Sequence, residues 1–541
     1  MPLNPGKLAL VGLDGATFRV LDPLLEQGVM PALHRLRQRG TGAILRSTVP
    51  TYTPPAWVSM ATGVNPGRHG VFGFLAGTPQ ERVEIAHAGL IDEPPMWRFL
   101  GEKGLRTGVF NIPMFYPPEP VNGFMVAGGL AAGWTETSRP NFSTDHSVTE
   151  LVGRIAGRRY PLDTVVSYES DWDRPEIVER IIDVQRLRRQ VLGALLDHSE
   201  VDVVFAVFEG VDRLQHLQYQ YIVDCSEWYA RPEAASMRDH AIAYFAELDR
   251  AIDELATWAG PDGNLLIVSD HGFGPWEKTL NLNLLLASWG YTRLPAVSRF
   301  TRAKVLAGTG QRLARRVVPR PLLHRIKARV QAGIDWEQSR AFASHVAEQG
   351  IHINVRGELP RGVVDATDVP RLELELTERL LDLEDPADGG PVVDRIVGRR
   401  EVVHGPHLTR SPHLFPFCRD QRYELSDTLA ARGPLTDHRD RPWGYHHTNG
   451  ILVAAGPTVR ASTSQGTVDI VDVLPTAFHL LGLPVPAGLD GRVATELLRD
   501  EAAAATTEPY RSTGERSESS PYSEEEEAQI EQSLRGLGYL E

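Results

Sequence analysis

Val203-Val204-Phe205-Ala206-Val207-Phe208 is an unbroken apolar run, and Asp212 and His216 follow shortly after it. A run of this length without a polar side chain is typical of a strand buried on both faces of a parallel sheet. Ligand-binding residues in such sheets lie just beyond the carboxyl ends of the strands. The stretch therefore predicts an α/β fold with a polar site that begins at Asp212.

Three further apolar runs carry an Asp or His at one end. They are residues 8–13 before Asp14, residues 265–268 before Asp270 and His271, and residues 451–455 after His446. With Asp212 and His216 the set contains three aspartates and three histidines, which is enough to hold two divalent cations. Two-metal sites are suited to chemistry on phosphoryl-type groups.

The composition excludes several classes of protein. The chain has 541 residues, 42% of them hydrophobic, and a formal net charge of −14. An acidic protein has no general attraction to nucleic acid or to an anionic membrane, so we expect a small-molecule substrate and no nucleic-acid partner. Cys225 and Cys418 form no pair motif. We expect a cytoplasmic protein, since we find neither a secretion segment nor an apolar run near the ~20 residues that span a bilayer.

Strand-like and helix-like runs alternate in the first third of the chain, which predicts a doubly wound, mostly parallel sheet flanked by helices. Further strands are expected at residues 43–47 and 107–111, and helices at residues 176–196, 237–259 and 470–481. We assign residues 1–275 to the first part of this core and residues 441–498 to the second.

Residues 276–440 are predicted to form a cap inserted into the core. A strand is expected at residues 350–355 and a helix at residues 368–381. Residues 299–334 contain ten Lys or Arg and no Asp or Glu. This basic segment fits either an amphipathic helical face or a surface that binds anions. Residues 499–541 are predicted to be an acidic, partly disordered tail that ends in a short docking helix at residues 530–540.

Thr53-Pro54-Pro55-Ala56-Trp57 begins a predicted helix, because proline is well tolerated in a first turn. A helix N-terminus binds phosphate through free N–H groups and partial positive charge. Thr53 is therefore a candidate nucleophile, provided that a metal favours its alkoxide. Thr51 is the competing hydroxyl.

The ordered set of motifs resembles the type I phosphodiesterase / nucleotide pyrophosphatase family of the alkaline phosphatase superfamily. The matching motifs span roughly residues 8–483 and are Leu13-Asp14-Gly15, Thr53-Pro54-Pro55-Ala56-Trp57, Ala61-Thr62-Gly63, Pro66-Gly67-Arg68-His69-Gly70, Asp212 to His216, Ser269 to Gly272, and Gly444-Tyr445-His446.

The resemblance implies a hydrolase with an alkaline phosphatase-like fold, two metal ions and a phosphothreonine intermediate. One ion is implied to bind Asp14, Thr53, Asp270 and His271, and the other Asp212, His216 and His446. Zinc is the expected ion, with manganese or iron as alternatives. His447 is the rival of His446, and His404 and His407 are further candidates near the site.

The sequence departs from the family at Phe74. Nucleotide pyrophosphatases carry an Asn at this position, where its side chain helps to hold a phosphate oxygen. An aromatic ring offers an apolar wall instead. We therefore expect diesters with an apolar or aromatic group to be better substrates than nucleoside triphosphates.

Phosphodiester or pyrophosphate hydrolysis is the function expected from these features. The alternatives are a phosphomonoesterase or phosphonate hydrolase of the same superfamily, and a non-catalytic protein that docks through the basic segment. We find no Gly-x-Ser-x-Gly elbow, no Gly-x-x-x-x-Gly-Lys-Ser/Thr loop and no sulfatase-type Cys/Ser-x-Pro-x-Arg motif.

Overall fold

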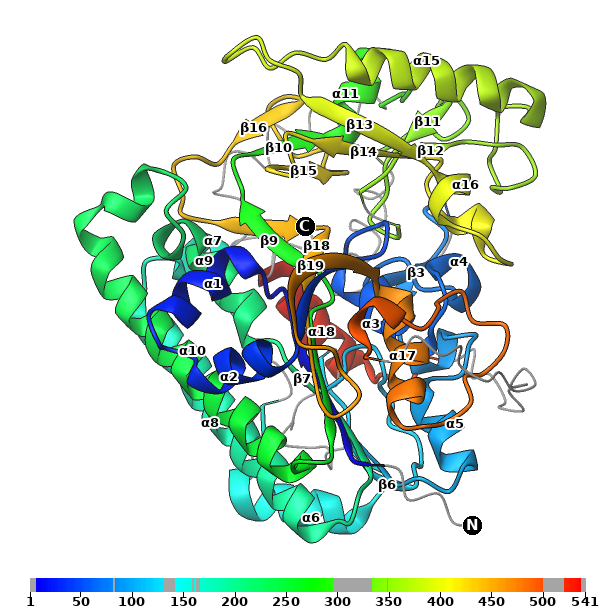
Figure 1. The fold of residues 1–541 in the computed structure, drawn as a ribbon. Helices are drawn as coiled ribbons and strands as arrows, with labels where there is room; N and C mark the ends of the chain where they lie inside the picture. Colours follow the sequence, from blue (N-terminus) through cyan, green and yellow to red (C-terminus); the bar gives the residue numbers. More distant parts are fainter. Residues whose placement is uncertain are drawn as a thin grey trace.

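An eight-stranded sheet forms the centre of the protein in a computed structural model (Figure 1). The structure describes residues 6–80, 83–129, 142–157, 160–161, 166–294, 333–347, 349–499 and 520–536. The strands lie across the sheet in the order β19 (Ser462–Asp469), β2 (Thr41–Arg46), β18 (Asn449–Ala455), β8 (Asn264–Val268), β1 (Leu8–Leu13), β7 (Val203–Phe208), β5 (Thr107–Phe110) and β6 (Gly123–Val126).

The sheet is parallel except for β18, which runs antiparallel to both of its neighbours, β8 and β2. Strands β1 and β7 pair in parallel from Leu8 opposite Val203 to Leu13 opposite Phe208. Every residue of these two strands is buried, as expected for strands covered by helices on both faces. The predicted α/β fold is confirmed.

Helices cover both faces of the sheet (Figure 1). On one side lie α8 (Pro175–His198), α10 (Pro232–Ala259), α1 (Phe18–Glu26) and α2 (Pro31–Arg39), and on the other lie α3 (Thr53–Thr62), α5 (Met96–Glu102) and α17 (Val473–Leu480). Helix α10 begins five residues before the predicted start, with Pro232 in its first turn. The other helices of the core include α4 (Pro66–His69), α6 (His146–Ala156), α7 (Tyr168–Asp171) and α9 (Gly210–Ile222).

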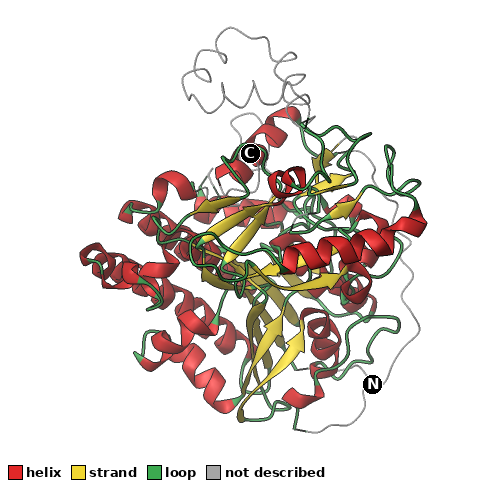
Figure 2. Cartoon of the chain, turned by 90° about the horizontal axis from the view of Figure 1, so that it is seen from above, coloured by secondary structure: helices red, strands yellow, loops and turns green. Residues whose placement is uncertain are grey.

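Smaller sheets lie beyond the carboxyl ends of the parallel strands (Figure 1), and Figure 2 shows the strands from above with helices on both sides. Their strands are β10 (Lys278–Asn281), β15 (Tyr423–Ser426) and β16 (Leu435–Asp437); β13 (Val393–Gly398) and β14 (Leu414–Cys418); β11 (Ala341–Phe342) and β12 (His352–Ile353); β9 (Gly272–Pro275) and β17 (Gly444–His447); and β3 (Leu75–Gly77) and β4 (Val83–Ile85). They are accompanied by α11 (Leu282–Ser288), α15 (Val369–Leu381) and α16 (Arg399–Val402).

Residues between Leu280 and Leu435 form a second hydrophobic cluster, separate from the cluster around the main sheet. The helix predicted at residues 368–381 is α15. The strand predicted at residues 350–355 is only the two-residue β12, because the backbone of Asn354 accepts hydrogen bonds from Val363 and Val364 instead of a partner strand.

The chain's last described element is α18 (Glu524–Gly536), which begins six residues before the predicted docking helix. The acidic run at residues 524–527, predicted as tail, is therefore the first turn of a helix, where negative charge is favourable. Ile530 and Leu534 are buried in the main core, and Tyr522 stacks on Tyr116 with ring centroids 5.3 Å apart.

Cys225 and Cys418 are both free thiols. None of the described helices combines the length and apolar character that a membrane crossing requires. Residues 299–332, most of the basic segment, lie outside the described residues.

Candidate metal centre

Four separate segments bring six predicted ligands to one place at the carboxyl ends of the strands. Asp14 directly follows β1, Asp212 and His216 lie on α9 after β7, Asp270 and His271 follow β8, and His446 lies on β17. All six side chains are buried. Strand β17 reaches this position because it pairs antiparallel with β9, placing His446 opposite Phe273.

Gly15 makes the turn after β1 possible. Its φ is +70°, a conformation that favours glycine, and a Cβ at this position would lie 2.6 Å from the ring of Phe273. Its N–H donates to Asp270 Oδ1 at 3.0 Å. The turn thereby fixes the carboxylate of Asp270 next to Asp14.

Asp212, His216 and His446 form the first group, and their ligand atoms lie within 4.8 Å of one another. His216 Nε2 and His446 Nε2 are 3.0 Å apart. Asp212 Oδ1 is 3.3 Å from the first nitrogen and 3.5 Å from the second. The structure thus brings together the three residues predicted for one ion.

The second group differs in part from the predicted set. Ligand atoms of Asp14, Asp212 and His271 lie within 4.8 Å of one another, so Asp212 is shared by both groups. Asp270 lies beside this group, with its Oδ2 3.3 Å from His271 Nε2. Its other carboxylate oxygen accepts the hydrogen bond from the Gly15 N–H. Asp212 reaches both groups because its side chain lies between His216 and Asp14.

Thr53 is the first residue of α3, and Pro54 and Pro55 occupy the first turn. Its Oγ1 lies 3.3 Å from His271 Nε2. The rival hydroxyl of Thr51 instead donates to the backbone oxygen of Thr48 at 3.0 Å. Thr53 is therefore the threonine next to the cluster.

His447 lies on the opposite side of β17 from His446, as neighbouring side chains on a strand do. Its Nδ1 accepts a hydrogen bond from Asn449 N at 3.1 Å, and its Nε2 is 3.7 Å from Asp420. The other two histidine candidates contact α4 or its N-cap: His404 Nε2 lies 2.9 Å from Asn65 Nδ2, and the backbone N–H of His407 donates to Gly67 O at 2.9 Å.

Burial dominates the electrostatics of the cluster. It lowers the pKa of His216 to about 4 and the pKa of His271 well below its usual value. Burial and the neighbouring Asp270 raise the pKa of Asp14, and burial raises the pKa of Asp270 to about 8. Burial also opposes ionisation of Asp212, but His216 and His446 outweigh it and lower the pKa of that carboxyl.

The cluster fits divalent cations. One carboxylate oxygen each of Asp14, Asp212 and Asp270 is buried without a hydrogen-bond partner among the described residues. Burying carboxylates in this way is costly unless a positive charge compensates it. Bound cations reverse the local pKa preferences, and imidazole nitrogens with carboxylate oxygens are donors that zinc accepts.

The sequence prediction missed supporting residues around the cluster. Trp57 Nε1 donates to Asp14 Oδ2 at 3.3 Å, and Arg213 donates to Asp212 Oδ2 at 2.5 Å. Trp57 comes one helical turn after Thr53, a spacing that places the two on one face of α3. Arg213 has no sequence signal beyond its position beside Asp212.

Phe74 is buried, only 6% exposed, in the main hydrophobic cluster with Leu75 and Ile85. Its backbone oxygen accepts a hydrogen bond from Ala86 N. Its predicted influence on the choice of substrate stays a prediction.

Solved enzyme structures match the chain over most of its length. It matches phosphonoacetate hydrolase from Sinorhizobium meliloti 1021, in complex with phosphonoformate, with a TM-score of 0.53 and 17% identity over 89% of this chain and 96% of that one. Human ectonucleotide pyrophosphatase / phosphodiesterase 5 matches with a TM-score of 0.47 and 15% identity over 91% of this chain and 100% of that one. The first likeness shows a shared alkaline phosphatase-like fold.

No curated protein sequence matches the chain. A family model, in contrast, matches residues 8–389, which is more than half of the chain and includes every predicted ligand except His446. On this match, the chain belongs to the type I phosphodiesterase / nucleotide pyrophosphatase family.

Proposed function

We propose that this protein hydrolyses phosphodiesters or pyrophosphates, with Thr53 as the nucleophile and two divalent cations, most simply zinc. The observation that carries the proposal is the position of Thr53 Oγ1, at the N-terminus of α3 and 3.3 Å from His271 Nε2. This hydroxyl adjoins a buried set of three carboxylates and three imidazoles. Such a set has no evident use in a protein that only docks a partner.

The residues divide the chemistry between them. The hydroxyl of Thr53 gives up its proton and its oxygen attacks phosphorus, so that a phosphothreonine forms. The bond to the leaving alcohol or phosphate breaks, and the leaving oxygen takes up a proton. A water molecule then attacks the same phosphorus, releases phosphate monoester and restores Thr53. The N-terminus of α3 offers partial positive charge to the phosphoryl oxygens throughout.

Asp14, Asp270 and His271 would hold one cation, and Asp212, His216 and His446 the other. Bound cations supply Lewis-acid polarisation of phosphoryl oxygens and favour ionised hydroxyls at neutral pH. Trp57 and Arg213 orient Asp14 and Asp212 by hydrogen bonds, as outer residues of metal sites commonly do.

A substrate screen tests the proposal. Purified protein is assayed with methyl 4-nitrophenyl phosphate, ATP, 4-nitrophenyl phosphate and phosphonoacetate, with Thr53→Ala as the control for each. We expect the highest catalytic efficiency with the diester or with ATP. Highest efficiency with the monoester would favour a phosphomonoesterase, and highest efficiency with phosphonoacetate would favour a phosphonate hydrolase. Phosphonoacetate is included because the chain shares its fold with phosphonoacetate hydrolase.

The screen also bears on Phe74, for which we expect the aromatic diester to exceed ATP. The variant Phe74→Asn is the direct test, and its stability must be measured alongside because Phe74 packs in the core. If none of the substrates shows Thr53-dependent turnover, the alternative that remains is a non-catalytic protein that docks through the basic segment.

A further inference from the structure

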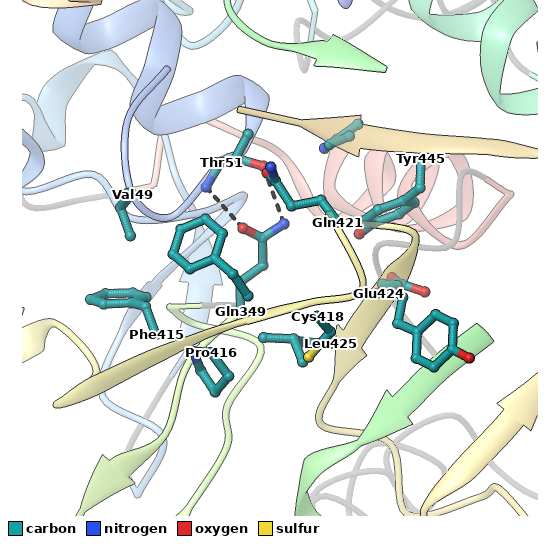
Figure 3. A pocket seen from close by; sticks show the side chains of 13 residues that line it. Val49, Thr51, Gln349, Phe415, Pro416, Cys418, Gln421, Glu424, Leu425 and Tyr445 are labelled. Carbon is teal, nitrogen blue, oxygen red and sulfur yellow. Dashed lines mark hydrogen bonds between the residues drawn. The ribbon is translucent and has the colours of Figure 1, made fainter. Parts of the chain in front are cut away.

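A pocket opens beside His446 and is lined by both the core and the inserted region (Figure 3). Val49 and Thr51 come from the loop before α3, whereas Phe415, Pro416 and Leu425 come from β14 and β15. Thr51 is two residues before the proposed nucleophile. A group attached to a phosphate at Thr53 therefore has this pocket within reach.

Gln349 joins the two sides of the pocket. Its side-chain oxygen accepts a hydrogen bond from Thr51 N at 2.8 Å, and its amide nitrogen donates to Thr51 O at 3.2 Å, as Figure 3 shows. Gln349 has φ +62°, a conformation that costs energy in a residue with a side chain and that clusters at functional sites. The pocket wall is therefore fixed to the loop that leads into Thr53.

Glu424 is the acidic group of the pocket. It accepts hydrogen bonds from Thr279 Oγ1 at 3.1 Å and from the hydroxyl of Tyr445. The Tyr445 hydroxyl also lies 2.7 Å from that of Tyr52, the residue before Thr53. This chain of hydroxyls holds the carboxyl group of Glu424 in a fixed relation to the nucleophile.

No basic side chain among the described residues of the pocket compensates the charge of Glu424. None of the lining residues in the described part of the chain is Lys or Arg. The basic side chains close to Glu424 in sequence are already paired, Arg419 with Asp388 and Arg422 with Glu277, each at 2.6 Å. Burial raises the pKa of Glu424 to about 7, as expected for a carboxyl group that lacks a positive partner.

We infer that this pocket receives the ester group of the substrate, and that it selects a small, uncharged or cationic, hydrogen-bond-donating group over an anionic one. The inference rests on the proposed function and narrows its substrate class. The cavity volume is about 40 Å³, and a water molecule needs about 10–15 Å³ on the same measure, so the group that enters has only a few heavy atoms. Glu424 accepts its hydrogen bonds, and Phe415 and Leu425 contact its carbon atoms.

Three 4-nitrophenyl phosphodiesters with the same reporter test the inference. Their second ester groups are 2-aminoethyl, 2-hydroxyethyl and carboxymethyl, and catalytic efficiencies are measured at pH 8, where Glu424 is ionised. We expect the aminoethyl ester to exceed the carboxymethyl ester by at least roughly tenfold, because like charges brought together at a binding site are strongly unfavourable.

Glu424→Gln keeps the shape of the side chain and should bring that ratio close to one. Asp437→Asn is the matched control, because it removes one negative charge from the same small sheet at an exposed position outside the pocket. It should leave the ratio unchanged. Circular dichroism confirms that both variants fold.

Two results would overturn the inference while leaving the proposed function intact. One is Thr53-dependent turnover with the carboxymethyl ester preferred, and the other is a ratio that Glu424→Gln does not change. Absence of Thr53-dependent turnover with all three esters would instead overturn the proposed function, and this inference with it.

Discussion

Thr51 and Thr53 differ in what their hydroxyl groups contact, although only Tyr52 separates them. Thr51 Oγ1 is held by the backbone of Thr48, whereas Thr53 Oγ1 lies beside His271. Thr53→Ala should therefore lower kcat by at least roughly two to four decades, the usual cost of losing an activated nucleophile, and Thr53→Ser should keep partial activity. Steady-state kinetics on the best diester measures both.

Thr51→Ala is the matched control for that experiment. It changes a threonine in the same way two residues away, and it should keep far more activity than Thr53→Ala. An inactive Thr51→Ala together with an active Thr53→Ala would show that the other threonine is the nucleophile.

The two adjacent histidines of β17 offer a second comparison at the level of single residues. His446→Ala removes a nitrogen 3.0 Å from His216 Nε2, so it should lower bound metal and reduce kcat/KM by at least roughly 100-fold, the upper range for outer residues of metal sites. His447→Ala should change neither strongly. Elemental analysis and kinetics on both variants check this, and the opposite pattern would assign the ligand to His447.

The grouping of the predicted ligands could be foreseen from the sequence because each lies close in the sequence to an apolar strand. Asp14 and Asp270 follow β1 and β8, which are neighbours in the sheet, so their proximity follows from the topology. The sharing of Asp212 between both groups could not be predicted, since it depends on the direction of one side chain. Glu424 was missed because its place beside Tyr445 arises only when distant parts of the chain fold together.

At the scale of elements, β12 carries a buried histidine that is expected to make the protein sensitive to acid. The ring of His352 stacks on Phe342, with centroids 5.1 Å apart, and its Nε2 has no hydrogen-bond partner within the described ranges. Burial, together with the positive charge of Arg399, lowers the pKa of His352 to about 3. The folded chain thus keeps this ring neutral at pH values where the unfolded chain protonates it.

The direction of the effect follows from this difference. Below the ordinary histidine pKa of about 6.5 the unfolded state binds the extra proton, so stability falls as the pH drops from there towards 3. His352→Phe should be less stable than the unmodified protein at pH 7.5. When the pH is lowered from 7.5 to 5.5, however, the free energy of unfolding of His352→Phe should fall by about 1 kcal/mol less than that of the unmodified protein.

Urea unfolding of both proteins at the two pH values measures the difference. His34→Gln, at a half-buried histidine on α2, is the control that removes an imidazole far from β12 in the sequence. If the free energy of unfolding falls equally in His352→Phe and in the unmodified protein, His352 is not held neutral by the fold.

For whole elements, periodicity predicted the long helices better than the short strands. Helix α8 agrees with its prediction to within two residues at each end, since its apolar positions recur at helical spacing. Strand β12 is much shorter than predicted, and β18 runs antiparallel to its neighbours. Apolar runs indicate burial, but they carry no information about strand direction or about where a partner strand ends.

At the scale of the whole molecule, the site depends on chain segments hundreds of residues apart. Asp14 follows the first strand, while His446 comes from β17, which returns to the core after the inserted region. The order of motifs predicted that these distant segments meet, because the strand ends of an α/β sheet lie together at one edge. Residues 299–332 lie outside the described residues, so the two interpretations of the basic segment stay predictions.

Metal removal is the prediction that involves the whole molecule. Three buried carboxylates at the junction of β1, β7 and β8 repel one another, and one oxygen of each lacks a hydrogen-bond partner in the described part of the chain. A ligand that binds only the folded state stabilises it by about 2.7 kcal/mol at a concentration 100 times its Kd. Prolonged chelation should therefore lower the Tm and abolish turnover together, and zinc or manganese should restore both.

Two variants separate the role of the metals from the role of the nucleophile. Thr53→Ala should be inactive but should still show a Tm that falls on chelation, because all six other ligands remain. His446→Ala should be inactive, and its Tm should fall less on chelation than that of Thr53→Ala, since one of the two proposed ion sites has lost a ligand. Elemental analysis should find two transition metals per active chain. Full activity in protein that contains none would refute the two-metal site, and would leave the hydroxyl of Thr53 without the cation that its proposed role requires.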